Sequence, residues 1–423
     1  MKKLSLSFLR PSGRTWLVLA LFALFALFAL AAVSPLLAAS LSPLAPQPDW
    51  STLQRYSGSI TSAEFERLLR QVYVPDGSWH QWITLSPSQA LITPHAGAAP
   101  VVLPLAPSGT TLRPPARFWK TRDDRSPQPG RPLAGLRIAI DPGHLGGSYA
   151  QMEARWFRIG NSRPVEEGEM TLIVAKLLKQ RLEAMGAEVW LTRTKNGPTT
   201  PLRPGNLKKA AAASLLEEGV ALTGERLQHE AERLFYRVGE IRNRAALVNK
   251  RIRPDLVVCL HFNAEEWGNP ARPTLTDQNH LHLLLSGAMS GGELQHEDER
   301  LTMLVKLLGG THREELGASE AVARSLASAT GLPPFTYHGA KAIPASSNPY
   351  LWIRNLLANR LFECPVVYCE PYVMNSRAVF NRIQLGDYAG RRNVGGTELP
   401  SIYREYADAV AQGLADYYSG TAH

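Results

Sequence analysis

The stretch that decides the fold is Ile138-Ala139-Ile140-Asp141-Pro142-Gly143-His144, an apolar strand that ends in an acid, a turn and a histidine. Two later stretches repeat this pattern of apolar residues followed by polar groups: Val257-Val258-Cys259-Leu260-His261-Phe262-Asn263 and Val366-Val367-Tyr368-Cys369-Glu370. Continuous apolar runs of this length are typical of strands buried on both faces of a sheet. The sequence therefore predicts a central sheet with polar side chains at the ends of three strands.

Helical patterns separate these strands. An amphipathic helix is predicted over 169–185, ended by Gly186, and a long helical stretch over 205–250. Further strands are predicted at 189–192 and 280–285, and further helices at 298–309, 314–330, 375–385 and 399–418. Alternating strands and helices predict an α/β fold, with a mixed, mostly parallel sheet flanked by helices.

The region before this sheet has a different composition. Residues 1–39 hold four Lys and Arg residues and then the apolar run Trp16–Val33, which is typical of a signal peptide or a membrane anchor. Both alternatives predict export, to the periplasm or cell envelope, because the positive charges stay on the cytoplasmic side. The expected order is then a linker at 40–55, a small α+β module at 56–105, a Pro-rich linker at 106–132 and a catalytic domain at 133–420.

Composition and charge exclude several classes of protein. The 423 residues are 44% hydrophobic and 20% charged, which is typical of a globular chain. The net charge of +9 falls to +5 without residues 1–39, and no long Lys/Arg run remains. We therefore expect no nucleic-acid partner, whereas weak attraction to a polyanionic cell wall fits. Three cysteines do not make a disulfide scaffold, so buried free thiols are expected.

The polar residues at the strand ends form a candidate catalytic site. The carboxyl ends of parallel strands meet at one edge of a sheet, which would bring His144, His261 and Glu370 together. Glu167 lies at the start of the helix after the first strand. Two imidazoles and a carboxylate are a ligand set of catalytic zinc, which keeps one position open for water. Glu370 would then be free to move protons, since a carboxylate after four apolar residues needs a partner or a role.

This ordered series of residues resembles the zinc-dependent N-acetylmuramoyl-L-alanine amidases, an exported family (type 3) that cleaves peptidoglycan. The resemblance covers about 240 residues. The pieces that carry it are Ile140 to His144 with Gly146-Gly147, Glu167 with its helix to Ala187, Val189 to Arg193, Arg244 to Asn249, Asp255 to Ala264, and Cys369 to Asn375.

The resemblance implies a role for each matching residue. By it, His144, Glu167 and His261 hold Zn²⁺, and Glu370 is the catalytic glutamate. Asn263 and Asn375 are assigned to substrate binding in the same way. The implied reaction is hydrolysis of the amide bond between N-acetylmuramic acid and L-alanine by zinc-activated water, with peptidoglycan as substrate.

The sequence departs from the family pattern at several points. Gly168 follows Glu167 where the family has Lys or Arg, which leaves Glu166 and Glu169 as alternative ligands. Segments 196–240 and 287–318 are larger than the family core needs. We expect the second to limit access to the zinc until an activator protein displaces it, because long polar connections are commonly lids.

Other interpretations stay open. The chain could be a wall-binding scaffold that has lost turnover, or a zinc peptidase that acts on the stem peptide. His280 and His282 share one face of the strand predicted at 280–285. A structural role is favoured for both, since better-placed residues already supply the ligands.

Overall fold

The computed structural model describes residues 40–126, 128–269, 272–339 and 341–420. Within these ranges a seven-stranded sheet forms the centre of the molecule, in the order β10-β11-β9-β12-β8-β4-β7. The bounds of its strands are β4 Arg137–Pro142, β7 Glu188–Leu191, β8 Leu256–Leu260, β9 Leu281–Leu285, β10 Ile343–Pro344, β11 Leu351–Ile353 and β12 Val366–Pro371. Strands β7, β4, β8 and β12 run parallel, whereas β9 is antiparallel to β12. The mixed, mostly parallel sheet is confirmed.

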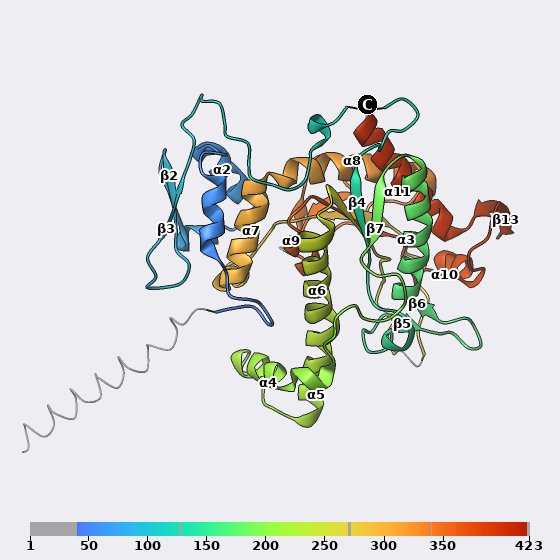
Figure 1. The fold of residues 1–423 in the computed structure, drawn as a ribbon. Helices are drawn as coiled ribbons and strands as arrows, with labels where there is room; N and C mark the ends of the chain where they lie inside the picture. The colour runs from blue at the N-terminus through green and yellow to red at the C-terminus, as the bar shows by residue number, and fades with distance from the viewer. Residues whose placement is uncertain (1–39, 127, 270–271, 340, 421–423) are drawn as a thin grey trace, which may run out of the picture.

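The sheet is buried on both faces, as its apolar strands require. Alternate side chains point to opposite faces of a strand, so Val258 and Leu260 pack with one layer of helices, and Val257 and Cys259 with the other. The first layer consists of α3 Glu167–Ala184, α8 Thr311–Thr330 and α11 Ile402–Ser419 (Figure 1). The second layer includes α6 Glu240–Leu247 and α9 Leu357–Leu361.

The stretch predicted as one or two helices over 205–250 is a series of helical segments. These are η7 Pro204–Leu207, α4 Lys208–Glu217, α5 Gly224–Arg233, η8 Leu234–Gly239, α6 and η9 Val248–Ile252. Figure 1 shows α4 and α5 projecting away from the sheet at the far end of the long α6 segment. The edge strands β10 and β11 were not expected, because segments of two and three residues carry too little pattern to be read.

The N-terminal module lies beside the helix α7 Glu297–Gly309 (Figure 1). Its elements are η2 Trp50–Tyr56, α2 Ser62–Leu68, η3 Leu69–Tyr73, η4 Ser78–Gln81, β1 Ile83–Leu85, β2 Gln89–Ile92 and β3 Val101–Pro104. Leu53 and Phe65 belong to the same buried cluster as Leu304 of α7. The Arg300 guanidinium donates to the carbonyl oxygen of Pro94 and stacks on the Trp82 ring at 3.7 Å. The module and the sheet domain thus share one core.

The two expected linkers are packed against the rest of the molecule. In the segment 40–55, Ser42 is buried and its hydroxyl donates to Asp298 at 2.6 Å. In the segment 106–132, Trp119 is buried and the Lys120 amide donates to Asp255 at 2.9 Å. Both segments therefore wrap the sheet domain.

The segment 287–318 is not a lid. It contains α7 and the start of α8, and nearly all residues of α7 are buried. The apolar side chains of α7 fill the core between the N-terminal module and the sheet domain. The expectation that this segment covers the site is wrong, because α7 is enclosed in the core, where Lys306 pairs with Glu315, and no residue of the segment lines the cleft of the candidate site.

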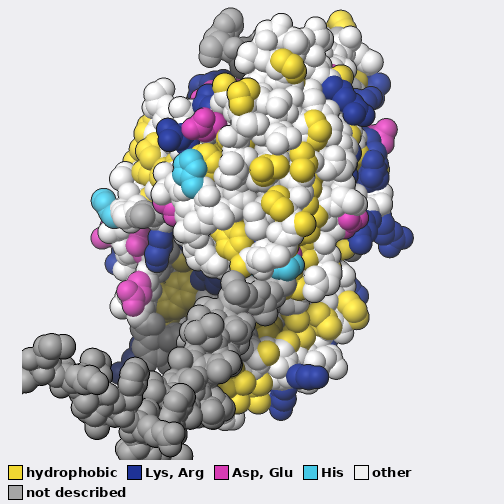
Figure 2. Space-filling model, turned by 90° about the vertical axis from the view of Figure 1, so that its left-hand side faces the viewer, with side chains coloured by type: hydrophobic (Ala, Val, Ile, Leu, Met, Phe, Trp, Pro, Cys, Tyr) yellow, Lys and Arg dark blue, Asp and Glu magenta, His cyan; other side chains and the backbone are white. Residues whose placement is uncertain are grey.

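The remaining short elements connect these layers. They are η5 Arg122–Asp124, η6 Gly147–Tyr149, β5 Trp156–Phe157, β6 Val165–Glu166, η10 Glu293–Gln295, α10 Arg377–Gln384, β13 Arg391–Val394 and β14 Thr397–Pro400. Figure 2, which faces the N-terminal module, shows apolar side chains in small scattered groups, with many Lys and Arg side chains along one edge. In the described ranges no helix combines the length and apolarity needed to cross a bilayer. The run Trp16–Val33 lies outside the described residues.

Candidate metal centre

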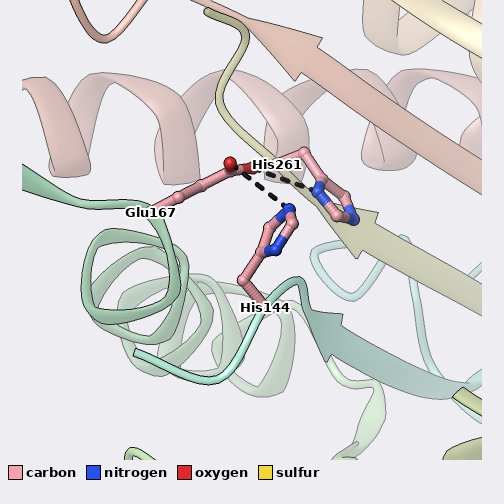
Figure 3. A group of neighbouring side chains, drawn as sticks. All are labelled: His144, Glu167 and His261. Carbon is pink, nitrogen blue, oxygen red and sulfur yellow. Dashed lines mark hydrogen bonds and ion pairs between the residues drawn. The ribbon is translucent and has the colours of Figure 1, made fainter. Parts of the chain in front are cut away.

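Three side chains from three elements meet at the carboxyl edge of the sheet. His144 lies in the loop after β4, Glu167 is the first residue of α3, and His261 directly follows β8 (Figure 3). One ligand atom from each lies within 4.8 Å of the other two. His144 Nε2 is 3.3 Å from Glu167 Oε2, and His261 Nδ1 is 3.1 Å from Glu167 Oε1.

The loop that carries His144 is held in an unusual backbone conformation. His144 has φ +60°, in the left-handed region that a non-glycine residue adopts only when its surroundings require it. The guanidinium of Arg193 donates to the carbonyl oxygens of Pro142 and Gly143. Arg244 donates to those of Pro142 and His144. Two buried arginines therefore fix the direction in which His144 points.

Two glycines let the loop approach the other ligands. A Cβ on Gly143 would lie 2.2 Å from the His261 ring. A Cβ on Gly168 would lie 2.2 Å from the backbone nitrogen of Gly146. The departure of Gly168 from the family pattern thus has a steric reason, because no side chain fits between the start of α3 and this loop.

The charge states of the cluster follow from burial and mutual contact. Burial alone would raise the pKa of Glu167, but His144, His261 and Arg155 together lower it to about 2. Burial lowers the pKa of His144 to about 3. Burial also acts to lower the pKa of His261, yet its hydrogen bond to Glu167 raises it. An ionised Glu167 and a neutral His144 are the forms in which these residues bind metals.

This donor set fits a zinc ion. Ligand atoms about 2.0–2.1 Å from a tetrahedral zinc lie about 3.3 Å from one another. The carboxylate of Glu167 has similar spacings to the two histidines, through Oε2 to His144 and through Oε1 to His261. A further carboxylate lies near His144, since Glu153 Oε2 is 3.8 Å from its Nδ1, and both oxygens of Glu153 accept from the Leu145 amide. Carboxylates beside metal-binding histidines commonly orient the ring.

Glu370 faces the same cleft as the cluster. The cleft has a volume of about 410 Å³ and is lined by His144, Glu167, His261 and Glu370 among others. Glu370 lies at the end of β12, beside β8, and Tyr368 of β12 stacks on the His261 ring at 4.6 Å. Burial raises the pKa of Glu370 to about 7. A carboxyl group with this pKa can both accept and release a proton near neutral pH.

The other candidate residues differ in whether they line the cleft. Asn263 lines the cleft and can contact a substrate. Asn375 is fully buried outside the cleft lining, where its Oδ1 accepts from the Glu265 amide at 3.0 Å. Asn375 therefore holds the loop around Glu265, and its role in substrate binding stays a prediction. Of the two alternative ligands, Glu166 accepts from the Gly147 amide and Glu169 pairs with Arg163, so both point away from the histidines.

Several residues that line the cleft were not expected from the sequence. Tyr236, Arg237 and Glu240 come from the segment 196–240 and its junction with α6. Tyr337 and Arg354 come from the chain around the unexpected strands β10 and β11. No local motif marks these residues, because only the strand order brings them to the cleft. Arg193, which holds the loop of His144, had a signal, since it lies two residues after the strand β7.

Comparisons with known proteins identify a family for most of the sheet domain. A sequence model described as N-acetylmuramoyl-L-alanine amidase matches residues 138–384, which is more than half of the chain. No curated protein matches the chain. The match to the amidase sequence model spans the strands β4, β8 and β12 and contains His144, Glu167, His261 and Glu370.

Several solved structures are similar to the chain. The apo form of the N-acetylmuramyl-L-alanine amidase Ami1 from Mycobacterium abscessus has 19% identity and a TM-score of 0.36, covering 67% of this chain and 99% of its own. The CwlD amidase from Clostridioides difficile, solved in complex with the GerS lipoprotein, has 13% identity and a TM-score of 0.38, covering 68% and 100%. The amidase AmiC2 of Nostoc punctiforme has 15% identity and a TM-score of 0.34, covering 67% and 98%. On the family match over residues 138–384, the chain belongs to the N-acetylmuramoyl-L-alanine amidase family and is a peptidoglycan hydrolase.

Proposed function

We propose that this amidase hydrolyses the bond between N-acetylmuramic acid and L-alanine with a zinc ion held by His144, Glu167 and His261. The observation that carries the proposal is the convergence of these three ligand atoms within 4.8 Å in the cleft that also contains Glu370. When bound, zinc supplies a water with a pKa near 7 and polarises the carbonyl group under attack.

Glu370 has the position and the pKa of the proton carrier. Amide hydrolysis needs a base for the attacking water and an acid for the leaving nitrogen, because an amide anion is a poor leaving group. Glu370 takes the proton of the water and passes it to the nitrogen of L-alanine, a contribution of about 10²–10⁴-fold. Asn263 lines the same cleft and can orient the substrate there.

The test separates metal binding from proton transfer. Glu370→Gln should keep about one zinc per chain, while kcat on purified muropeptides falls at least about a hundredfold. His261→Ala should lose the zinc as well as the activity. His80→Ala, at an exposed position in the N-terminal module, is the matched control and should change neither. Elemental analysis and turnover are measured on the same preparations.

Two results would contradict the proposal. Undiminished zinc in His261→Ala would remove this residue from the ligand set. Near-normal kcat in Glu370→Gln would make Glu370 a structural strand end. Product analysis decides between the reactions: intact peptides headed by L-alanine indicate an amidase, released D-alanine a stem-peptide peptidase, and no product a silent wall-binding scaffold.

The place of action follows from the substrate. We infer that the chain is exported and works in the cell envelope, with residues 16–33 as signal or anchor. Mass spectrometry of the N-terminus of the protein isolated from cells distinguishes a cleaved signal from a retained anchor. An activator protein remains a proposal without an assigned contact surface, since α7 is buried and the segment 287–318 does not line the cleft.

A further inference from the structure

Arg354 is a cation in the cleft that forms no direct ion pair, although Glu370 is near enough for the two charges to attract each other. It directly follows β11, is partly buried and lines the cleft with Glu370. Among the described residues no carboxylate oxygen lies within 4.0 Å of its guanidinium, which instead donates to the Tyr337 hydroxyl at 3.2 Å. Withdrawing a cation from water is costly unless an anion compensates it. Glu370 compensates this charge only from a distance, so an anionic group of the substrate in direct contact with the guanidinium would add to that compensation.

The Tyr337 hydroxyl is prepared to donate to the same group. Tyr337 Oη lies 2.9 Å from His282 Nε2, while His282 Nδ1 is buried and has no partner among the described residues. Burial lowers the pKa of His282 to about 3, so the ring is neutral and has one N–H. Placing that hydrogen on Nε2 leaves no buried N–H unpaired, which is the favoured arrangement. Tyr337 Oη then accepts from His282 and Arg354, and its own hydrogen points to a third partner.

The position of these residues fits the second residue of the stem peptide. In the sheet, His261 follows β8, β12 carries Glu370, and β9 carries His282 directly opposite Glu370. Because neighbouring strands are about 4.8 Å apart, His282 lies about 10 Å from the strand of the metal ligand. An extended peptide covers about 3.4 Å per residue, so two to three residues span this distance. The second residue of the stem peptide, D-glutamate, keeps a free carboxylate.

We propose that Arg354 and Tyr337 form a carboxylate subsite, positioned by His282, that selects stem peptides with a free carboxylate on the second residue. This inference rests on the proposed function, because it takes the scissile bond to lie at His144, Glu167 and His261. The subsite adds a preference among stem peptides to the proposed hydrolysis of the bond between N-acetylmuramic acid and L-alanine.

The experiment compares three synthetic muramoyl substrates with the full chain. The first has L-alanine followed by D-glutamate with its α-carboxylate free, the second has that carboxylate amidated, and the third ends in L-alanine methylamide. Charged hydrogen bonds should give the first at least about a tenfold higher kcat/KM than the second. Arg354→Met and Tyr337→Phe should reduce this preference to within about threefold, and kcat/KM for the third substrate should fall by a smaller factor than kcat/KM for the first.

Matched variants separate the subsite from a general effect of charge or folding. Arg237→Met removes another arginine of the cleft, an exposed one, and should keep the preference. His282→Met should weaken the preference, whereas His282→Gln, which keeps a donor near the position of Nε2, should restore part of it. Calorimetry in the Glu370→Gln protein gives a second measurement, since the carboxylate substrate should bind at least about tenfold more tightly than its amide.

The outcomes distinguish this inference from the proposed function. Equal kcat/KM for the first two substrates, with normal turnover of the third, would overturn the subsite alone. Equal loss of activity on all three substrates in Arg354→Met and Tyr337→Phe would also overturn it, because a specificity residue spares the substrate without the carboxylate. If the unmodified chain turned over none of them, the proposed function would fail, and equal binding of both peptides in calorimetry would then overturn the subsite as well.

Discussion

Glu370 shows how the environment of one residue sets a chemical property. Its carboxyl group lies at the end of a buried strand, where burial raises its pKa and the nearby His261 and Arg354 act to lower it. The net pKa of about 7 belongs to the protein without a metal ion. A cation held by the neighbouring cluster would stabilise the ionised carboxylate and lower this value.

The rate of hydrolysis should therefore fall on acidification. Glu370 acts as a base only when ionised, so kcat/KM should decrease about tenfold per pH unit below its pKa, with the acid limb at or below about pH 7. The sign follows from the raised pKa, because a raised value extends the protonated, inactive form to higher pH. Steady-state kinetics between pH 5 and 8 would measure the limb.

Metal loss must be separated from this titration, since protonated histidines also release zinc. Zinc content measured at each pH is the control. A flat rate down to pH 5 in protein that retains its metal would contradict the role of Glu370 as base.

At the scale of elements, the contact between the loop after β4 and the start of α3 positions two of the proposed metal ligands, His144 and Glu167. Gly168→Ala should force the loop that carries His144 away from Glu167, because the new Cβ would lie 2.2 Å from a backbone nitrogen. Such overpacking typically costs about 1–3 kcal/mol of stability. We expect a lower melting temperature and zinc occupancy reduced at least severalfold, measured by calorimetry and elemental analysis.

Gly224→Ala, at the start of α5, is the matched control for this glycine. Nothing lies within 4 Å of a Cβ at that position, so stability should be unchanged or rise by up to about 1 kcal/mol. Full zinc occupancy in Gly168→Ala would show that the loop can shift without moving His144.

The direction of one strand explains what the sequence could and could not predict about the cleft. His144, His261 and Glu370 were predictable because they follow strands that run parallel, and parallel strands end at one edge. His282 lies near the start of its strand, and the same rule would place it at the opposite edge. Because β9 runs antiparallel to β12, its start lies at the catalytic edge. Strand direction depends on long-range pairing, which local patterns do not contain.

At the scale of the whole molecule, the N-terminal module should be inseparable from the amidase domain. Deleting residues 40–105 would expose the apolar side chains of α7 that share their core with Leu53 and Phe65. Each exposed leucine costs about 1.5–3 kcal/mol, so a loss of at least about 3 kcal/mol in the free energy of unfolding is expected. Denaturant unfolding of the deletion variant and of the full chain would measure this difference.

Cooperative unfolding of the full chain is the second part of this prediction. Trp82 in the module should report the same transition as the far-ultraviolet signal of the sheet domain. Two separate transitions, or an unchanged stability of the deletion variant, would show that the module is an independent unit.

Because the module shares its core with α7, it cannot complete its folding until α7 has been synthesised. The module is synthesised first, but α7, which completes its core, follows Leu105 by nearly 200 residues. At about 5–20 residues per second, synthesis of about 200 residues takes about 10–40 s. During this interval the apolar side chains of the module have no native partner and can be engaged by a chaperone. Such a delay would suit the export proposed above, because the module would stay unfolded until α7 has been synthesised.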